Sequence, residues 1–203
     1  MAMAIDGKRI LFVDVETDGL PFRRDFFDPL QMPHIVQAAW IVADGKGQIL
    51  RSACRIVKPE GFSIPQSAVK VHGISTSMAR EQGTAPRIVL HVLNREIDRA
   101  DKVVAHNLDF DADVIASESG RFGMPCSILA TPGYCTMKNT KDLTQLGFPD
   151  NPYPKEWKWP TLEELYRYLF GRTFSGVHDA GADVRACYDC YWELKRIKWI
   201  KGR

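Results

Sequence analysis

Three segments with strand character follow one another at the start of the chain, and they limit the possible folds more than any other feature. The predicted strands cover residues 8–15, 35–43 and 48–57, with a turn at 44–47. Strands that follow one another in sequence usually lie side by side, so we expect these three to form an antiparallel meander. Residues 102–105 form a short apolar run between helical patterns, as expected for a buried parallel strand. We therefore expect an α/β fold with a mixed sheet flanked by helices.

Helical patterns occupy much of the remaining chain. A short turn opens at Pro65 and runs through Val71, Ser75 caps a second helix, and Pro86 opens a longer helix that reaches about Arg99. The predicted apolar stripe of that longer helix contains Ile88, Val89, Val92, Leu93, Glu96 and Ile97.

Further elements are predicted in the second half of the chain. Residues 109–120 indicate a helix and 134–137 a strand. Thr161 caps a helix at 162–169, with Glu164 in the capping-box position. A last helix is predicted from about Ala180 to Trp199, and its buried face is expected to contain Val184, Cys187, Tyr191 and Leu194.

Two long segments lack periodicity. One is 21–33 and the other is 139–160, and loops of that length are more often functional than not. The second has Tyr153, Trp157 and Trp159 interleaved with Lys155 and Lys158, a mixture that can stack on single-stranded bases and contact phosphates. The alternative is that Trp159 and Pro160 pack into the core and order the loop.

Composition narrows the class of protein. With 203 residues and 45% apolar side chains the chain can bury a sizeable core, and we expect one domain over 1–203. A formal charge of +2 does not by itself indicate nucleic-acid binding. No apolar run is long enough for a membrane span, and no secretory signal is visible. Five scattered cysteines predict a reduced, cytoplasmic protein, and a zinc or redox role for the Cys187/Cys190 pair is the weaker interpretation.

The first strand carries an unusual acidic pair. Asp14 and Glu16 are two residues apart, so both carboxylates project from the same face of the strand. Burying a carboxylate costs on the order of 2 kcal/mol or more unless it is paired or metal-bound. The functional interpretation is a divalent cation site. The structural alternative is that the strand ends at Asp14 and the acids begin a solvated turn.

A second acidic segment follows the predicted strand at 102–105. Asp109 is favoured as a helix N-cap, and Asp111 then lies in the first turn, where the helix dipole favours a negative charge. Asp111 is therefore either a site residue or a surface acid. His106 and Asn107 can bind a phosphate or sugar, or can hold the turn together by side-chain hydrogen bonds.

The third segment opens the last helix. His178 precedes the helix and Asp183 lies in its first turns, beside the predicted buried face. Histidine suits a general base at neutral pH. The alternative is a capping histidine with a solvated aspartate. Four carboxylates gathered in one place would repel each other unless cations are present, and Mg²⁺ or Mn²⁺ prefers such oxygen ligands. Two ions about 3.5–4 Å apart can clamp the oxygens of an in-line displacement at phosphorus.

These three segments resemble the motifs of the DEDDh exonucleases, the DnaQ-like group that includes RNase T and the epsilon proofreading subunit of bacterial DNA polymerase III. The motif D-x-E-T-x-G-L matches Asp14 to Leu20, H-N-x-x-F-D matches His106 to Asp111, and H-x-x-x-x-D matches His178 to Asp183. The order and the separations also fit. The resemblance extends from about Lys8 to Leu194 and selects Asp111 over Asp109.

The resemblance implies a ribonuclease H-like fold and a role for each site residue. Asp14, Glu16, Asp111 and Asp183 would hold two Mg²⁺ or Mn²⁺ ions, and His178 would take the proton from the attacking water. The residues implied to contact the substrate are Thr17, Leu20, His106, Asn107 and Phe110.

The implied activity is removal of nucleoside 5′-monophosphates from single-stranded 3′ ends, with DNA favoured over RNA, as in DNA repair and proofreading. The alternatives are a non-catalytic nucleic-acid-binding or polymerase-associated module on the same fold, and an RNA-trimming enzyme of the RNase T or oligoribonuclease type. The implied partners are single-stranded DNA or RNA ends. Homodimerisation or association with a polymerase is compatible with the resemblance, and no membrane partner is expected.

Overall fold

The computed structural model describes residues 7–21, 32–147 and 156–200. They form a five-stranded sheet with the order β3-β2-β1-β4-β5. The first three strands pair antiparallel, whereas β4 runs parallel to β1 and β5 runs parallel to β4. The predicted meander and the predicted parallel strand are therefore confirmed. The strands are β1 (Arg9–Thr17), β2 (Ile35–Asp44), β3 (Ile49–Ile56), β4 (Lys102–Ala105) and β5 (Gly133–Cys135).

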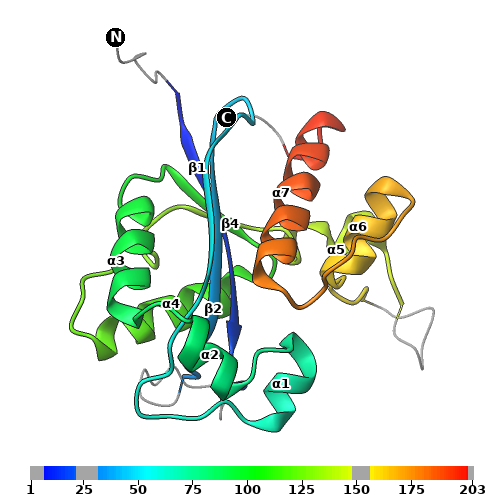
Figure 1. Ribbon diagram of the computed structural model, residues 1–203. Helices are drawn as coiled ribbons and strands as arrows, with labels where there is room; N and C mark the ends of the chain where they lie inside the picture. The colour runs from blue at the N-terminus through cyan, green and yellow to red at the C-terminus, as the bar shows by residue number, and fades with distance from the viewer. Residues whose placement is uncertain (1–6, 22–31, 148–155, 201–203) are drawn as a thin grey trace.

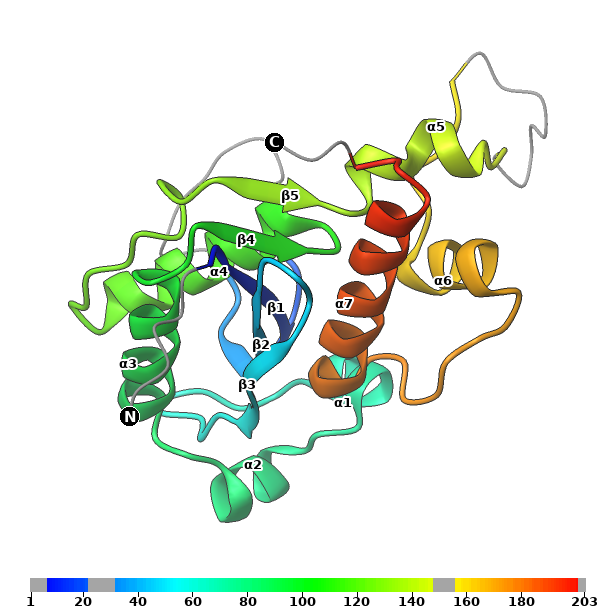
Figure 2. The ribbon, with the colours of Figure 1, turned by 90° about the horizontal axis from the view of Figure 1, so that it is seen from above.

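Helices cover both faces of the sheet, as Figures 1 and 2 show. One face carries α3 and α4, the other carries α7 with α6 outside it, and α1 and α2 lie at one end of the sheet. No helix in the described part of the chain is long and apolar enough to cross a membrane. The helices are α1 (Gln66–His72), α2 (Thr76–Gln82), α3 (Pro86–Ile97), α4 (Leu108–Arg121), α5 (Lys141–Thr144), α6 (Leu162–Phe170) and α7 (Ala180–Arg196), with a 3₁₀ turn η1 at Lys138–Thr140.

The central strand β1 is buried on both sides. Leu11, Val13 and Val15 belong to the core beneath α3 and α4, whereas Ile10 and Phe12 belong to the core beneath α7. Side chains alternate along a strand. Positions 14 and 16 therefore continue the row of Ile10 and Phe12 and face α7.

The predicted buried face of α7 is confirmed, and Tyr191 on that face contacts two strands of the sheet. Val184, Cys187, Tyr191 and Leu194 are all buried. The Tyr191 ring makes edge contacts with Phe12 and Tyr134 at centroid distances of 5.3 and 5.5 Å. These contacts fix the helix against the sheet.

The predicted apolar stripe of α3 is wrong in part. Val89, Leu93 and Ile97 are buried as predicted, but Ile88 and Val92 are 58% and 42% exposed. Leu90 occupies the core in their place, because only the narrower i, i+3, i+4 stripe faces the sheet.

The last helix is shorter than predicted. It ends at Arg196 because Lys198 adopts a left-handed conformation with φ of +61°. The Trp199 and Lys198 amides then donate to the carbonyls of Leu194 and Lys195, at 2.9 and 3.1 Å. This pair of bonds is the Schellman motif that terminates many helices.

The segment 139–160 was predicted to be irregular, but it contains most of η1 and all of α5. The strand predicted at 134–137 covers Gly133–Cys135 instead. Trp159 is 54% exposed while Pro160 is buried, so the alternative that both residues pack into the core is wrong for the tryptophan. Tyr153 and Lys155 lie outside the described residues, as does most of the loop predicted at 21–33.

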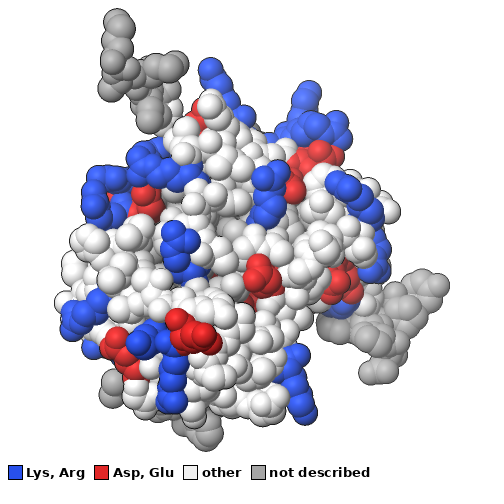
Figure 3. Space-filling view, viewed as in Figure 1, with Lys and Arg blue, Asp and Glu red and all other residues white. Residues whose placement is uncertain are grey.

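Charged side chains of both signs are interspersed on the face shown in Figure 3. That face has no continuous basic surface, in agreement with the small net charge of +2.

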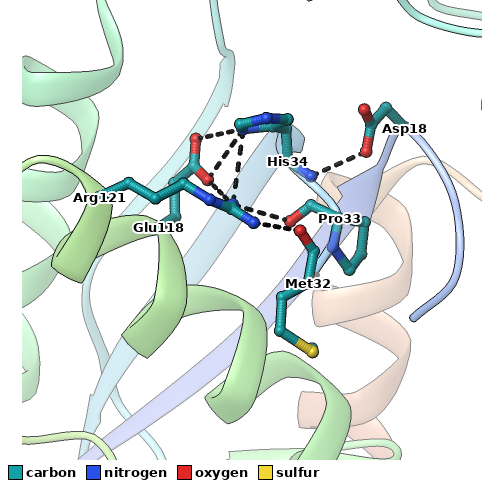
Figure 4. Close-up of polar contacts among 6 residues, drawn as sticks. All are labelled: Asp18, Met32, Pro33, His34, Glu118 and Arg121. Atoms are coloured by element: carbon teal, nitrogen blue, oxygen red, sulfur yellow. Dashed lines mark hydrogen bonds and ion pairs between the residues drawn. The ribbon is translucent and has the colours of Figure 1, made fainter. Parts of the chain in front are cut away.

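A buried ion pair anchors the start of β2 to α4 (Figure 4). Glu118 is buried and pairs with the guanidinium of Arg121 and with the His34 ring, whose Nδ1 lies 3.2 Å from the carboxylate. The guanidinium also donates to the carbonyls of Met32 and Pro33. The chain entering β2 is therefore held by a helix on one face of the sheet.

The same anchor reaches the end of β1. The His34 amide donates to the Asp18 carboxylate at 2.7 Å, and the Asp18 amide donates to the His34 carbonyl at 3.1 Å. The His34 ring also stacks on Phe62 at a centroid distance of 4.1 Å. This pair of bonds ties Asp18, in the bend after β1, to the residue that precedes β2.

Replacing Glu118 with alanine should lower the free energy of unfolding by about 3 kcal/mol, because Arg121 would lose its buried partner. Urea denaturation measures the change. Glu81→Ala, at an exposed position on α2, is the matched control and should change stability by less than about 0.5 kcal/mol. Equal effects of the two substitutions would contradict a stabilising role for the ion pair.

Candidate active site

Asp14 and Glu16 lie near the end of β1 and are both partly buried. In the ladder with β2 they stand opposite Ala39 and Gln37. The register shifts between Glu16 and Thr17, so the ladder becomes irregular immediately after the acidic pair. The strand does not end at Asp14, and the solvated-turn alternative is therefore wrong.

Asp111 reaches the same place from the opposite face of the sheet. It lies in the first turn of α4 and is only 3% exposed. Strand β4 pairs with β1 only as far as Phe12, so the amide of Val15 lies beyond that ladder. This amide donates to Asp111 Oδ1 at 3.1 Å. The surface-acid alternative for Asp111 is therefore wrong.

The predicted N-cap role of Asp109 is also wrong. Helix α4 begins after Asn107, which has a left-handed conformation with φ of 76° and makes no side-chain cap bond. Asparagine tolerates this conformation better than most residues. Asp109 instead pairs with Lys138 and is exposed.

Asp183 and His178 are placed by the N-terminus of α7. The Asp179 side chain accepts a hydrogen bond from the Ala182 amide and so caps the helix. His178 has a φ of 65°, and its amide donates to Asp183 Oδ2 at 3.0 Å. The other oxygen, Oδ1, is buried and has no hydrogen-bond partner in the described residues. Asp183 therefore presents a desolvated acceptor that a cation could satisfy.

A residue that sequence reasoning missed connects α7 to β2. Gln37 is buried, its Nε2 donates to Asp179 Oδ2 at 3.0 Å, and its Oε1 accepts the Ala180 amide at 2.9 Å. It stands opposite Glu16 in the ladder. Gln37 thus fixes the start of the helix that carries Asp183. The available signal was a glutamine inside an otherwise apolar strand.

Burial and mutual repulsion shift the titration of the cluster. Burial raises the pKa of Glu16 to about 7 and that of Asp183 to about 6, with further contributions from neighbouring carboxylates. The pKa of Asp14 is raised by burial and then by Asp111, Asp183 and Glu16. Burial also raises the pKa of Asp111, although the Val15 amide opposes that shift.

These shifts make the cluster unfavourable at neutral pH. A carboxyl group whose pKa is higher in the folded chain binds more protons there than when unfolded. Its contribution to stability therefore falls as pH rises from the unfolded pKa near 4 through the folded values of about 6 to 7. Above about pH 7 a positive charge is needed to offset the repulsion between the ionised carboxylates.

The donor set fits a hard divalent cation. Glu16, His178 and Asp183 each offer a ligand atom within 4.8 Å of the others. Asp111 lies close enough to Asp14 for its charge to raise the pKa of Asp14. Carboxylate oxygens are the ligands that Mg²⁺ and Mn²⁺ prefer. A cation would also satisfy the unpaired Asp183 oxygen.

All four carboxylates and His178 line one cleft with a volume of about 640 Å³. Of the predicted substrate contacts, Leu20, His106, Asn107 and Phe110 line it too. Leu20 is 74% exposed, so its side chain does not pack in the core. Thr17 is not among the lining residues, and its hydroxyl donates to the Gly19 carbonyl at 2.6 Å.

His106 is engaged within the protein. Its Nε2 lies 3.1 Å from the Pro160 carbonyl and its Nδ1 lies 2.9 Å from the Thr136 hydroxyl. Burial lowers the pKa of His106 to about 4, so the ring is neutral at pH 7. A carbonyl only accepts, and Nε2 therefore carries the proton. Of the two predicted roles, the structure favours the one in which His106 ties the turn together.

Comparison with known families identifies the chain. Residues 11–191 match the model of the RNase_T family, described as Exonuclease. The chain belongs to this exonuclease family. Its match spans every residue of the acidic cluster and His178. A comparison with curated protein sequences finds no match.

Solved structures of an exonuclease share this fold. One is the zinc-ion-bound complex of E. coli exonuclease I with single-stranded DNA, with a TM-score of 0.74 and 21% identity over 95% of this exonuclease-family chain. Another is E. coli exonuclease I in complex with a dT13 oligonucleotide, with a TM-score of 0.73 and 21% identity over 94% of this chain. The likeness supports a ribonuclease H-like fold. The chain spans 41% and 42% of the length of those two proteins.

The Gln37 contact predicts a non-additive pair of substitutions. Gln37→Glu should lower the free energy of unfolding by about 2 kcal/mol, because it removes the donor to Asp179 and buries a second carboxylate against it. Adding Asp179→Asn should recover at least half of that loss, since the new amide can donate in the reverse direction while still capping α7.

Denaturation of wild type, both single variants and the double variant measures the coupling. The Asp179→Asn single variant completes the cycle, because with the cap kept its amide donor meets the Gln37 donor and the contact is lost from the other side. Strictly additive changes would mean that Gln37 does not hold the start of α7.

Proposed function

We propose that this protein is a metal-dependent 3′–5′ exonuclease that hydrolyses phosphodiester bonds of single-stranded nucleic acid, DNA in preference to RNA, and releases nucleoside 5′-monophosphates. The observation that carries the proposal is the convergence of four carboxylates and His178 on one cleft. Family membership supports it. The preference for single-stranded DNA is supported by neighbours of the same fold whose structures contain it.

The carboxylates are the groups that would hold the cations. Glu16 and Asp183 offer oxygens within 4.8 Å of one another, and their charges raise the pKa values of both Asp14 and Asp111. When bound, two divalent ions neutralise the phosphodiester and stabilise the charge that develops on its attacking and leaving oxygens. The presence of all four acids favours catalysis over a non-catalytic binding role.

His178 is the proposed general base. The residue is exposed and lines the cleft, where its ring can reach water. Its backbone is fixed by the hydrogen bond that its amide donates to the Asp183 carboxylate. A ring nitrogen would accept the proton of the attacking water, and the exposed ring can pass that proton to solvent. The left-handed φ of 65° sets this residue apart from α7, which begins two residues later.

Leu20 and Phe110 are the proposed contacts to the terminal nucleotide. Both line the cleft, and Leu20 exposes most of its apolar side chain. The turn that carries Leu20 is tied to β2 through Asp18 and His34. A well-positioned apolar side chain beside the carboxylates can pack against a base and hold the scissile phosphate in place.

His178→Gln should lower the rate of mononucleotide release by about 100-fold or more, because general base catalysis contributes roughly that factor. Asp14→Asn, or removal of divalent ions by a chelator, should abolish release. The assay follows a 5′-labelled oligonucleotide over time as single-stranded DNA, duplex DNA and RNA, with Mg²⁺ or Mn²⁺.

His91→Gln is the matched control, because His91 is an exposed histidine on α3, away from the cleft. It should retain wild-type activity. Activity that survives both chelation and Asp14→Asn would refute the metal-dependent mechanism. Faster degradation of RNA than of single-stranded DNA would instead assign the protein to RNA trimming.

A further inference from the structure

Trp159 is an exposed aromatic residue in the wall of the catalytic cleft. More than half of its surface, 54%, is accessible, although it lines the same cleft as Asp14, Glu16 and Asp183. A single exposed apolar side chain on a protein surface is ordinary. A large exposed indole in the same cleft as a cluster of acidic side chains is less common, because an aromatic ring does nothing to stabilise the carboxylates.

The backbone beneath Trp159 is fixed on both sides. Pro160 is buried, and its carbonyl accepts the hydrogen bond from His106 Nε2 at 3.1 Å. On the other side the Lys158 amide donates to the Leu146 carbonyl at 2.9 Å. The capping box of α6 begins immediately afterwards. The backbone that carries the indole is therefore held in place while the indole stays uncovered, so little backbone entropy would be lost when a ligand contacts it.

A cation stands beside the indole. The ammonium group of Lys138 lies 5.9 Å from the centroid of the Trp159 ring and is paired with Asp109. Lys138 remains 39% exposed in this arrangement. An aromatic face next to an accessible ammonium group matches the chemistry of a nucleotide, which offers a flat base and a negative phosphate.

We infer that Trp159 and Lys138 form a nucleotide subsite in which the indole stacks on a base upstream of the 3′-terminal nucleotide and the ammonium group contacts an adjoining phosphate. This inference rests on the proposed function, since it assumes that a nucleic-acid strand occupies the cleft. The subsite reads no base identity, because every base has a face that can stack. It favours single strands, whose bases are free to leave their neighbours.

The first test compares two tryptophan variants. Trp159→Ala should weaken binding of a 5′-labelled single-stranded oligonucleotide about 10-fold, equivalent to about 1.4 kcal/mol, and Trp159→Phe should retain most of the affinity. Fluorescence anisotropy in the presence of a chelator measures binding without hydrolysis. Tyr168→Ala is the matched control, because Tyr168 is 52% exposed on α6 and does not line the cleft, and this variant should bind as wild type does.

The second test locates the stacked base. A series of oligonucleotides carries one abasic position, moved stepwise from the 3′ end. One upstream position should weaken binding to wild type but not to Trp159→Ala, because the variant has already lost that contact. If every abasic position weakens both proteins equally, Trp159 does not stack on a base.

The third test concerns the ammonium group. Lys138→Gln should reduce the slope of log affinity against log salt by about 0.7, the value for one phosphate contact in a single strand. Asp109→Asn should leave that slope unchanged or raise it, since it releases Lys138 from its carboxylate partner. An unchanged slope in Lys138→Gln would remove Lys138 from the subsite.

Hydrolysis by the wild-type protein is measured separately, so the two proposals can fail independently. If the wild-type protein hydrolyses the strand but Trp159→Ala binds it as tightly as wild type does, the subsite alone is overturned. If the wild-type protein binds the strand without hydrolysing it, and Trp159→Ala loses that binding, the subsite is supported and the proposed activity is overturned.

Discussion

Four carboxylates from three distant segments share one cleft, and their mutual repulsion must be offset if the chain is to fold around them. Burial raises the pKa of each one, and the neighbouring charges raise it further for Asp14, Glu16 and Asp111. Two backbone amides partly offset the free-energy cost of burying these charges. The Val15 amide donates to Asp111 and the His178 amide donates to Asp183. The remaining negative charge is what a divalent cation would neutralise.

The sheet makes this convergence possible because its central strand is covered on both faces. The cluster contains groups from β1, from α4 beneath one face and from α7 beneath the other. Asp111 reaches the site at the point where β4 stops pairing with β1, which leaves the Val15 amide available. Gln37 then sets where α7 begins relative to β2. The short length of β4 therefore matters to the site, because a longer β4 would pair with the Val15 amide that Asp111 uses.

Local patterns predicted the elements well because their causes are local. The capping box of Thr161 and Glu164, the cap at Ser75 and the alternation in β1 all depend on residues within a few positions of each other. Errors arose where a tertiary contact or an unusual backbone conformation decided the outcome. The end of α7 depends on the left-handed Lys198, and the position of Asp109 depends on its pairing with Lys138.

The cluster itself could be proposed from the sequence only when the three acidic segments were considered together. Taken singly, Asp14, Asp111 and Asp183 each had an ordinary structural alternative, and only the joint pattern favoured a shared site. The contacts that support the site were harder to foresee. Gln37 and His106 act through partners 30 or more residues away in the chain, and such pairings leave no periodic signal.

Proton release on cation binding tests the central claim that this carboxylate cluster is a cation site. Calorimetric titration of the metal-free protein with Mg²⁺ at about pH 6.5, in two buffers with different ionisation enthalpies, counts the protons displaced. Because burial raises the pKa of Glu16 to about 7, binding should release on the order of one proton, and Glu16→Gln should release fewer. The release from Glu16 and Asp183 should diminish as pH rises toward about 8.5, well above the pKa values of about 7 and about 6 of these two groups. Absence of Mg²⁺ binding, or binding without proton release at any pH from about 6 to 8, would contradict the account.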